Sequence, residues 1–285
     1  MGKVIFLNGK FIPEEQAQVS ILTPGFLYGW GLFETMRAYN KKIVYFDKHL
    51  ERLKKSARLL NIRFPYSLAQ FKEVIHEVVK INGLRDAYVR LTLWKCERGT
   101  DTLIIAKKYQ PYSSQKYKKG FRACISPFRQ NQDSFLAQLK TTNYLLYRLA
   151  YAKAREKGFD EAIILNHKGY IAETSRSNLF LIKDKELFTP SLECSCLNGI
   201  TRRVIFDLAK KYNIKAYEGN FSIPDLYACD EAFLTNSLMG IMPLVSVEGR
   251  RIGRGISRYK IIRFFIEKYK SLYIRGLKPR LSRRG

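Results

Sequence analysis

The most informative stretch of this sequence is Lys140-Thr141-Thr142-Asn143-Tyr144, where an extended segment enters a predicted helix. Lys140 lies there among small polar residues rather than among other charges. A lysine is usually solvated at the surface. One held in a desolvated pocket, however, has a lowered ammonium pKa, which suits bonding to a carbonyl carbon and proton transfer. Lys140 is therefore a candidate for a reactive amine.

Three polar segments follow Lys140 in the chain. Glu173 ends a predicted strand and precedes Thr174-Ser175-Arg176-Ser177-Asn178. The stretch Asn198-Gly199-Ile200-Thr201-Arg202-Arg203 opens a predicted helix, whose free N–H groups and positive dipole end can bind a phosphate. Ser237, in the turn Thr235-Asn236-Ser237, could add a hydroxyl to that phosphate, and Arg52 could add a cation.

Each of these residues also has an ordinary interpretation. Glu173 could be a loop acid, Arg52 could be a surface residue, and every helix has an N-terminus. Together, an amine, a carboxylate and two donor-rich turns are what a pyridoxal 5'-phosphate pocket requires. The carboxylate would pair with the pyridinium nitrogen and keep it protonated.

Length and composition indicate a folded protein large enough for two domains. The chain has 285 residues, of which 46% are hydrophobic and 27% charged. No apolar run approaches the roughly 20 residues needed to span a bilayer, so no membrane association is expected. The first residues turn polar at Asn8, too soon for a secretory signal. The five cysteines are scattered and odd in number, which favours reduced thiols and a cytoplasmic location.

The net charge of +26 raises the possibility of a nucleic-acid partner. Residues 250–284 are rich in Lys and Arg and contain one acid, Glu267. Apolar residues in 256–273 nevertheless fit a helix with one packed face, so the charges can form its solvated face. We therefore expect no nucleic-acid binding. A flexible basic tail is predicted over residues 275–285.

The predicted elements indicate an α+β fold rich in antiparallel hairpins. Asn8-Gly9 is a hairpin signal, residues 47–60 and 68–82 are predicted helices, and residues 88–94 alternate as a strand. The polar stretch 110–120 is the best linker. We expect an N-terminal α/β domain over residues 1–112, a linker over 113–120 and a cofactor-anchoring C-terminal domain over 121–274.

Arg98 follows the predicted strand 88–94 and could bind a substrate carboxylate through two hydrogen bonds, although a lone arginine there is usually solvated. His49, His76 and His167 are far apart in the sequence, with no carboxylate or cysteine at ligand spacing. No metal site and no histidine base are expected.

Several motifs together resemble the class IV (fold-type IV) pyridoxal-phosphate enzymes. This family includes branched-chain aminotransferases, D-amino-acid aminotransferases and 4-amino-4-deoxychorismate lyase. The resemblance covers residues 4–252 and is carried by Gly25-Phe26-Leu27-Tyr28-Gly29-x-Gly31-x-Phe33-Glu34-Thr35-x-Arg37, His49-Leu50-Glu51-Arg52-Leu53, Lys140-x-x-Asn143, Glu173-x-x-x-x-Asn178-Leu179-Phe180, Gly199-Ile200-Thr201-Arg202 and Thr235-Asn236-Ser237-x-x-x-Ile241-x-Pro243.

The resemblance implies a fold, a cofactor and roles for residues. It implies a homodimer in which each chain has two domains with pyridoxal 5'-phosphate in the cleft between them. Lys140 would be the Schiff-base lysine and Glu173 the partner of the pyridine nitrogen. The residues expected around the phosphate are Arg52, Ile200, Thr201 and Ser237.

Within the family, the motifs look most like the lyase. Asn143 follows Lys140 by three positions, as in the lyase and the D-amino-acid enzymes, and the segments 33–37 and 235–243 are lyase-like. Phe33 and Thr100 stand where the D-amino-acid enzymes have tyrosine and histidine. The loop after Arg98-Gly99 lacks the glycine-rich continuation of the lyase.

The leading expectation is therefore a lyase that releases pyruvate and 4-aminobenzoate in folate synthesis. Thr35 would assist proton delivery, and Arg98, Phe33 and Asn143 would bind a substrate that bears an amine and a carboxylate. The first alternative is an amino-acid transaminase for branched-chain or D-amino acids. A more distant one is a basic nucleic-acid-binding protein with a non-catalytic pocket.

Overall fold

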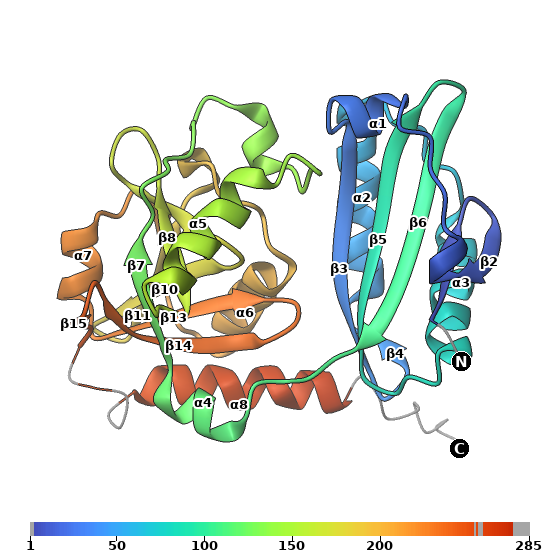
Figure 1. The fold of residues 1–285 in the computed structure, drawn as a ribbon. Coiled ribbons are helices and arrows are strands. Elements are labelled where there is room, and N and C mark those ends of the chain that lie inside the picture. Colours follow the sequence, from blue (N-terminus) through green and yellow to red (C-terminus); the bar gives the residue numbers. More distant parts are fainter. Residues whose placement is uncertain (1–2, 254, 256–258, 276–285) are drawn as a thin grey trace, which may run out of the picture.

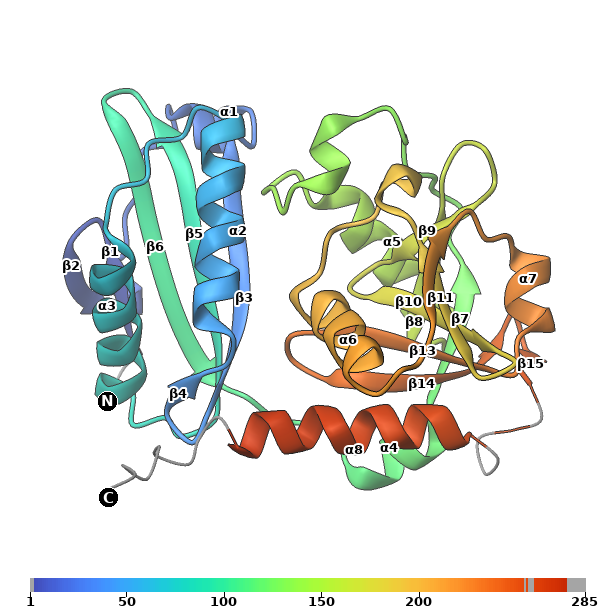
Figure 2. The same ribbon diagram turned by 180° about the vertical axis from the view of Figure 1, so that it is seen from behind.

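Two β-sheets lie side by side, each with its own helices (Figure 1). The computed structural model describes residues 3–253, 255 and 259–275. Figure 2 shows the same two sheets from behind, each with its own helices. This arrangement matters because the site described below takes residues from both sheets.

The first sheet has six strands in the order β2-β1-β6-β5-β3-β4, and every pairing is antiparallel. Helices α2 and α3 cover one of its faces (Figures 1 and 2). Leu50 of α2 and Phe71 of α3 are fully buried against strand residues such as Leu91. The elements are β1 (Val4–Leu7), β2 (Lys10–Pro13), η1 (Glu14–Gln16), α1 (Pro24–Leu27), β3 (Gly31–Tyr39), β4 (Lys42–Ile43), α2 (Phe46–Leu59), α3 (Leu68–Ile81), β5 (Ala87–Cys96) and β6 (Gly99–Lys108).

The second sheet has nine strands and is mixed. Eight of them run in the order β12-β11-β10-β13-β14-β7-β8-β9, and β15 pairs with β14. The pairs β11–β12, β14–β7 and β7–β8 are parallel, and the others are antiparallel. The strands are β7 (Phe121–Ile125), β8 (Glu161–Leu165), β9 (Ile171–Thr174), β10 (Asn178–Lys183), β11 (Glu186–Pro190), β12 (Ala216–Gly219), β13 (Glu231–Asn236), β14 (Gly240–Val247) and β15 (Arg250–Arg251).

Helices pack on this sheet through apolar side chains. Val204 and Phe265, from two different helices, pack with Phe180 and Phe233, whose rings stack 4.9 Å apart. Ala150 of a third helix packs with the strands around it. The elements are α4 (Ser114–Lys119), η2 (Phe135–Gln138), α5 (Leu145–Glu156), η3 (Leu192–Cys194), α6 (Ile200–Lys211), α7 (Ile223–Ala228) and α8 (Lys260–Arg275).

The structure confirms the α+β, antiparallel-rich fold class expected from the sequence. The segment 113–120, predicted to be a linker, contains the short helix α4, because the Ser113 hydroxyl accepts a hydrogen bond from Lys116 N. The division into domains stays a prediction. Of the predicted tail 275–285, only Arg275, at the end of α8, lies within the described residues.

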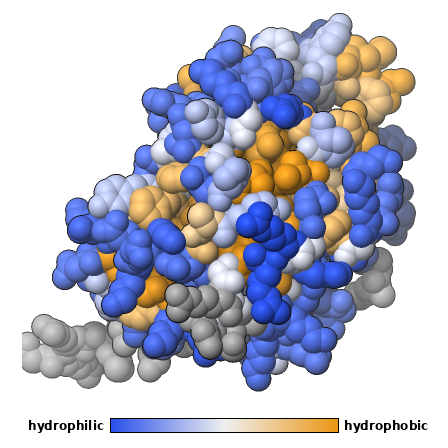
Figure 3. Space-filling view, turned by 90° about the vertical axis from the view of Figure 1, so that its left-hand side faces the viewer, coloured by the Kyte–Doolittle hydropathy of each residue, from blue (hydrophilic) through white to orange (hydrophobic). Residues whose placement is uncertain are grey.

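The surface on the side of the second sheet is largely hydrophilic, with apolar residues gathered near its centre (Figure 3). Among the described residues, no helix combines the length and the apolar content needed to cross a membrane.

Candidate active site

A cavity of about 490 Å³ is lined by residues of both sheets. From the first sheet come Phe33 and Thr35 of β3 and Arg90 of β5, together with Arg52 of α2. From the second come Lys140, Tyr144, Tyr147, Glu173, Gly199, Ile200, Thr201 and Ser237, among others. Residues more than 180 positions apart in the chain thus share one cavity wall.

Lys140 is fixed to the first sheet, although it lies between β7 and α5, which belong to the second sheet and its helices. Its carbonyl accepts a hydrogen bond from Phe33 N at 2.9 Å, and Thr142 N donates to Gly31 O at 2.9 Å. Thr142 Oγ1 donates to Gly29 O at 2.7 Å. This short extended segment therefore runs alongside the start of β3. The hydrogen bonds between them fix the backbone at Lys140 and with it the direction of the lysine side chain. Lys140 Nζ lies 4.5 Å from the centre of the Phe33 ring.

The surroundings of Lys140 favour its neutral amine. Desolvation and then the positive charge of Arg52 lower its pKa, and the carboxylates of Glu34 and Glu173 raise it by less. The pKa of Lys140 is about 8 as a result. A primary amine with a pKa near neutrality can attack a carbonyl carbon and can accept and return protons.

Glu173 is buried and lines the same cavity. One carboxylate oxygen, Oε1, accepts a hydrogen bond from the Tyr147 hydroxyl at 3.0 Å, and Oε2 accepts one from Asn178 Nδ2 at 3.3 Å. Burial raises the pKa of Glu173 to about 7, although the Tyr147 hydrogen bond and the charge of Lys140 act to lower it. The carboxyl group is therefore poised to pair with a cationic group in the cavity.

A buried cluster around Glu34 connects two of the predicted phosphate ligands. Arg52 donates from Nε and Nη2 to the two oxygens of Glu34, at 2.7 and 2.6 Å, and from Nη1 to Asn198 O at 3.0 Å. His49 Nδ1 lies 2.7 Å from Glu34 Oε2, and its Nε2 lies 3.3 Å from Ser237 Oγ. One carboxylate thus orients both Arg52 and, through His49, the Ser237 hydroxyl.

The start of α6 has the properties of an anion site. Gly199 is its N-cap and supplies no capping side chain, so the first N–H groups of the helix have no partner within it. Gly199, Ile200 and Thr201 line the cavity. Thr235 Oγ1, also buried at the cavity wall, has no hydrogen-bond partner among the described residues. These donors have room for a group that brings its own acceptors.

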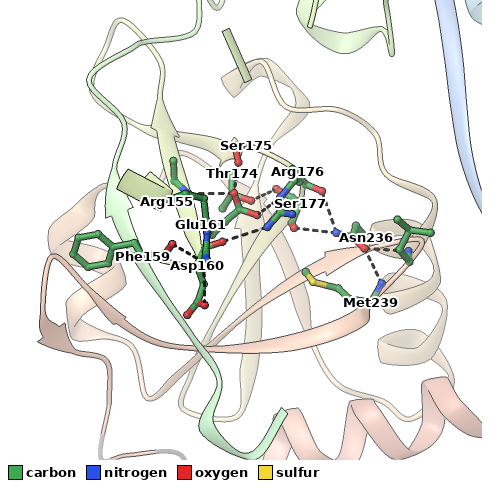
Figure 4. Close-up of polar contacts among 12 residues, drawn as sticks. Arg155, Phe159, Asp160, Glu161, Thr174, Ser175, Arg176, Ser177, Asn236 and Met239 are labelled. Atoms are coloured by element: carbon green, nitrogen blue, oxygen red, sulfur yellow. Dashed lines mark hydrogen bonds and ion pairs between the residues drawn. The ribbon is translucent and has the colours of Figure 1, made fainter. Parts of the chain in front are cut away.

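A second network holds the turn that carries Ser237 (Figure 4). Arg176 donates from Nε to buried Glu161 at 3.4 Å, and from Nη2 to Asp160 O at 3.2 Å. Asn236 Nδ2 donates to Arg176 O at 3.3 Å. Asn236 Oδ1 accepts from Met239 N at 2.9 Å, within the turn between β13 and β14. The position of Ser237 is therefore set from both sides.

The structure brings most of the predicted site residues together. The cavity is lined by Lys140, Glu173, Arg52, Ile200, Thr201, Ser237, Phe33 and Thr35. Two predicted substrate-binding residues are elsewhere. Asn143 is exposed and donates from Nδ2 to Gly29 O at 3.0 Å, and Arg98 lies in the turn between β5 and β6. Neither lines the cavity, and their roles in substrate binding stay predictions.

Sequence reasoning missed several cavity residues, among them Arg90, Tyr88 and Tyr147. Arg90 Cζ lies 3.7 Å from the centre of the Phe33 ring and can present a guanidinium to a carboxylate. Tyr88 lies two positions before it on β5 and also faces the cavity. The sequence contains a signal for Tyr88 and Arg90, because they are polar side chains at alternate positions of an otherwise apolar strand and so share one face of it. Tyr147 carries no such signal, because it is 26 residues from Glu173 and only the fold brings the two side chains together.

Comparisons with known proteins agree with this geometry. A family model described as amino-transferase class IV matches residues 31–247. A Methanocaldococcus jannaschii protein, provisionally assigned as a branched-chain-amino-acid aminotransferase, is 36% identical over 260 residues, covering 87% of this chain and 89% of that protein. The solved branched-chain amino acid aminotransferase of Escherichia coli is 27% identical with a TM-score of 0.89, covering 99% and 98% of the two chains. A Legionella pneumophila structure, provisionally assigned as 4-amino-4-deoxychorismate lyase, is 26% identical with a TM-score of 0.83, covering 90% and 96%.

Proposed function

The chain belongs to the amino-transferase class IV family, and from that premise we propose that it transfers amino groups between branched-chain L-amino acids and 2-oxo acids. The observation that carries the proposal is the similarity to branched-chain aminotransferases over most of both chains. From the sequence alone, this function is the alternative to the lyase. The lyase, the leading expectation from the sequence, has less support: relatives 36% identical in sequence are assigned as branched-chain aminotransferases, whereas the lyase assignment comes from a structure that is 26% identical.

Enzymes of this family depend on pyridoxal 5'-phosphate. The residues of the cavity fit that cofactor. The amine of Lys140 would hold its aldehyde carbon, and Glu173 would face its ring nitrogen. The uncapped start of α6, with Ile200 and Thr201, would hold its phosphate together with the cation of Arg52 and the hydroxyl of Ser237. When bound, the cofactor withdraws electrons from the substrate carbon that carries the amino group.

The chain's own residues supply binding and proton transfer. With a pKa of about 8, Lys140 has an accessible neutral form that can take a proton from the α-carbon and return it to a neighbouring carbon. The guanidinium of Arg90 can hold the substrate carboxylate. Phe33, Leu197 and Met239 give the cavity apolar wall that suits a branched aliphatic side chain. Thr35 also lines the cavity, and its part in proton delivery stays a prediction.

The test is a substrate panel on one cofactor-loaded preparation. We expect L-leucine, L-isoleucine and L-valine to give their 2-oxo acids with 2-oxoglutarate as acceptor. Borohydride reduction followed by peptide mapping should place the cofactor on Lys140. Lys140→Ala should abolish transfer, whereas Lys153→Ala, which changes an exposed lysine of α5, should not. Pyruvate release from aminodeoxychorismate without transamination would favour the lyase instead, and turnover of D-amino acids alone would also contradict the proposal.

We further propose that the enzyme works as a homodimer. Large apolar side chains are exposed at residues 21–28 and at the start of α5, including Leu22 at 69%, Phe26 at 63% and Leu145 at 68%. Several large apolar side chains exposed in one segment are typical of a surface that contacts another protein. Arg98 does not line the cavity of its own chain, and a second copy is one way to bring it to a substrate. Light scattering on the purified protein tests this proposal. The cytoplasmic location stays a prediction.

A further inference from the structure

Tyr147 makes a contact that the chemistry described so far does not require. Its hydroxyl donates to Glu173 Oε1 at 3.0 Å, and both side chains line the cavity. An ionised carboxylate can accept about four hydrogen bonds. Glu173 receives this one, a longer one of 3.3 Å from Asn178 and a contribution from the Leu197 backbone. Acceptor capacity therefore remains on the side of Glu173 that faces the cavity.

Burial favours the neutral form of Glu173, whereas its expected role requires the ionised form. A carboxylate can keep a pyridine nitrogen protonated only while it is itself ionised. Burial favours the protonated acid, whereas a hydrogen bond donated to the carboxylate favours the ionised form. Tyr147 is first among the groups that lower the pKa of Glu173 against that burial. Its own pKa is raised well above the ordinary value by burial and by Glu173, so its hydroxyl stays protonated and can donate.

The tyrosine ring is held in place for this contact. Tyr144 and Tyr147 are three positions apart around the first turn of α5, and their rings stack at 4.7 Å with planes 20° apart. The hydroxyl of Tyr144 donates to Ser175 O at 3.1 Å and does not compete for Glu173. Two neighbouring tyrosines thus have different partners, and only Tyr147 is directed at the carboxylate.

We propose that Tyr147 is a positioning residue that keeps Glu173 ionised and aimed at the ring nitrogen of the cofactor. This role rests on the cofactor chemistry of the proposed function and not on the choice of amino acid. A carboxylate that lost the tyrosine would be protonated more often at neutral pH. A neutral Glu173 would no longer stabilise the positive charge of a protonated ring nitrogen.

Other groups around Glu173 contribute to its charge state and must be held constant. Lys140 and Arg52 are the cations that act on it, and the Leu197 backbone donates toward it. Tyr144 and the buried thiol of Cys196 lie close enough for its charge to raise their own pKa values. None of these groups is altered by removing a single hydroxyl from Tyr147.

The experiment is a titration of Glu173 in the full-length protein freed of cofactor. Carboxyl-labelled glutamate is followed by carbon NMR, and the Glu173 signal is assigned by its loss in Glu173→Gln. Tyr147→Phe keeps the stacked ring and removes the hydrogen bond. Since a hydrogen bond to a charged group contributes about 1.5–3 kcal/mol, the acid dissociation constant of Glu173 should fall about tenfold or more.

Tyr144→Phe is the matched control, because it removes an equivalent hydroxyl from the same turn of α5 without touching Glu173. It should leave the Glu173 titration within about threefold of wild type. The absorbance of the cofactor-loaded protein, followed against pH, should move for Tyr147→Phe in the same direction as the NMR titration.

An unchanged Glu173 titration in Tyr147→Phe would overturn the proposal, and so would an equal change in Tyr144→Phe. Because the NMR experiment needs neither substrate nor turnover, these outcomes are separate from failure of the amino-acid panel.

Discussion

Replacing Glu34 with glutamine should destabilise the protein by about 3 kcal/mol, and two estimates from the structure agree on this size. Glu34 is fully buried, and the Arg52 side chain is 12% exposed, so their ion pair is an interior one. Removing one partner of a buried pair typically costs about 3–5 kcal/mol, because the other charge is left without compensation.

The charge state of Glu34 gives the second estimate. Burial raises its pKa, but the charges of Arg52 and His49 and their hydrogen bonds outweigh burial and lower the pKa from 4.5 to about 2. A lowered pKa stabilises the folded state above the unfolded pKa, and the benefit is lost as the pH falls through the folded pKa. A difference of about 2.5 units corresponds to about 3 kcal/mol at pH 7. Glutamine imitates the protonated acid and should lose about this amount.

The measurement is urea unfolding of wild type and Glu34→Gln at pH 7, followed by circular dichroism. Glu77→Gln is the control, because it removes an acid from an exposed pair with Lys80, and it should change the unfolding free energy by less than about 0.5 kcal/mol. Glu34→Gln should also bind pyridoxal 5'-phosphate more weakly, since Arg52 and His49 lose their common partner. A loss below about 1 kcal/mol, or an equal loss in the control, would refute the reasoning.

Two further predictions follow from the same geometry. The pKa of Glu173 is raised from 4.5 to about 7, so its contribution to folding is present below pH 4.5 and is lost as the pH rises through 7. Cofactor-free Glu173→Gln should therefore gain about 3 kcal/mol relative to wild type between pH 4.5 and 7.5, measured by urea unfolding, and a constant difference would contradict this. For Gly31→Ala, the added carbon would lie 2.9 Å from both Leu93 O and Thr142 Oγ1, so we expect a loss of roughly 1–3 kcal/mol and lower cofactor occupancy. Gly219→Ala, whose nearest neighbour would be 3.4 Å away, is the control, and equal effects in the two variants would exclude this explanation.

Some local features of the candidate site could be predicted from sequence. Glu173 lies near the end of β9 and Ile200 begins α6, and each of these features is set by residues within a few positions. The roles of these residues toward the cofactor stay predictions. The capping box of α3 is a similar case, since Ser67 and Gln70 exchange hydrogen bonds over three residues. Short-range chemistry of this kind is visible in one sequence.

The contacts between segments could not be predicted in the same way. Glu34 and His49 are 15 residues apart, and they meet only because α2 packs on β3. The sequence alone therefore predicts no role for His49, although its ring connects Glu34 to Ser237. Tyr147 and Glu173 are 26 residues apart, and the fold of the second sheet brings them together. The sequence does not separate the lyase from the transaminase, because both reactions are expected to use Lys140 in the same way.

The first half of the molecule is the six-stranded sheet with its helices, and the second half is the nine-stranded sheet with its helices. Each half fixes site residues that belong to the other half. The backbone around Lys140 is fixed by hydrogen bonds to β3 of the first sheet. In the opposite direction, Arg52 of the first half donates to Asn198 O beside α6, and His49 reaches Ser237 of the second half. The amine and the anion site therefore take their relative positions from the docking of the two halves. In the proposed function, the cofactor would place its aldehyde at the amine and its phosphate at the start of α6, so it would bind only the docked arrangement. Its binding free energy consequently adds to the stability of the whole molecule and not to that of either sheet alone.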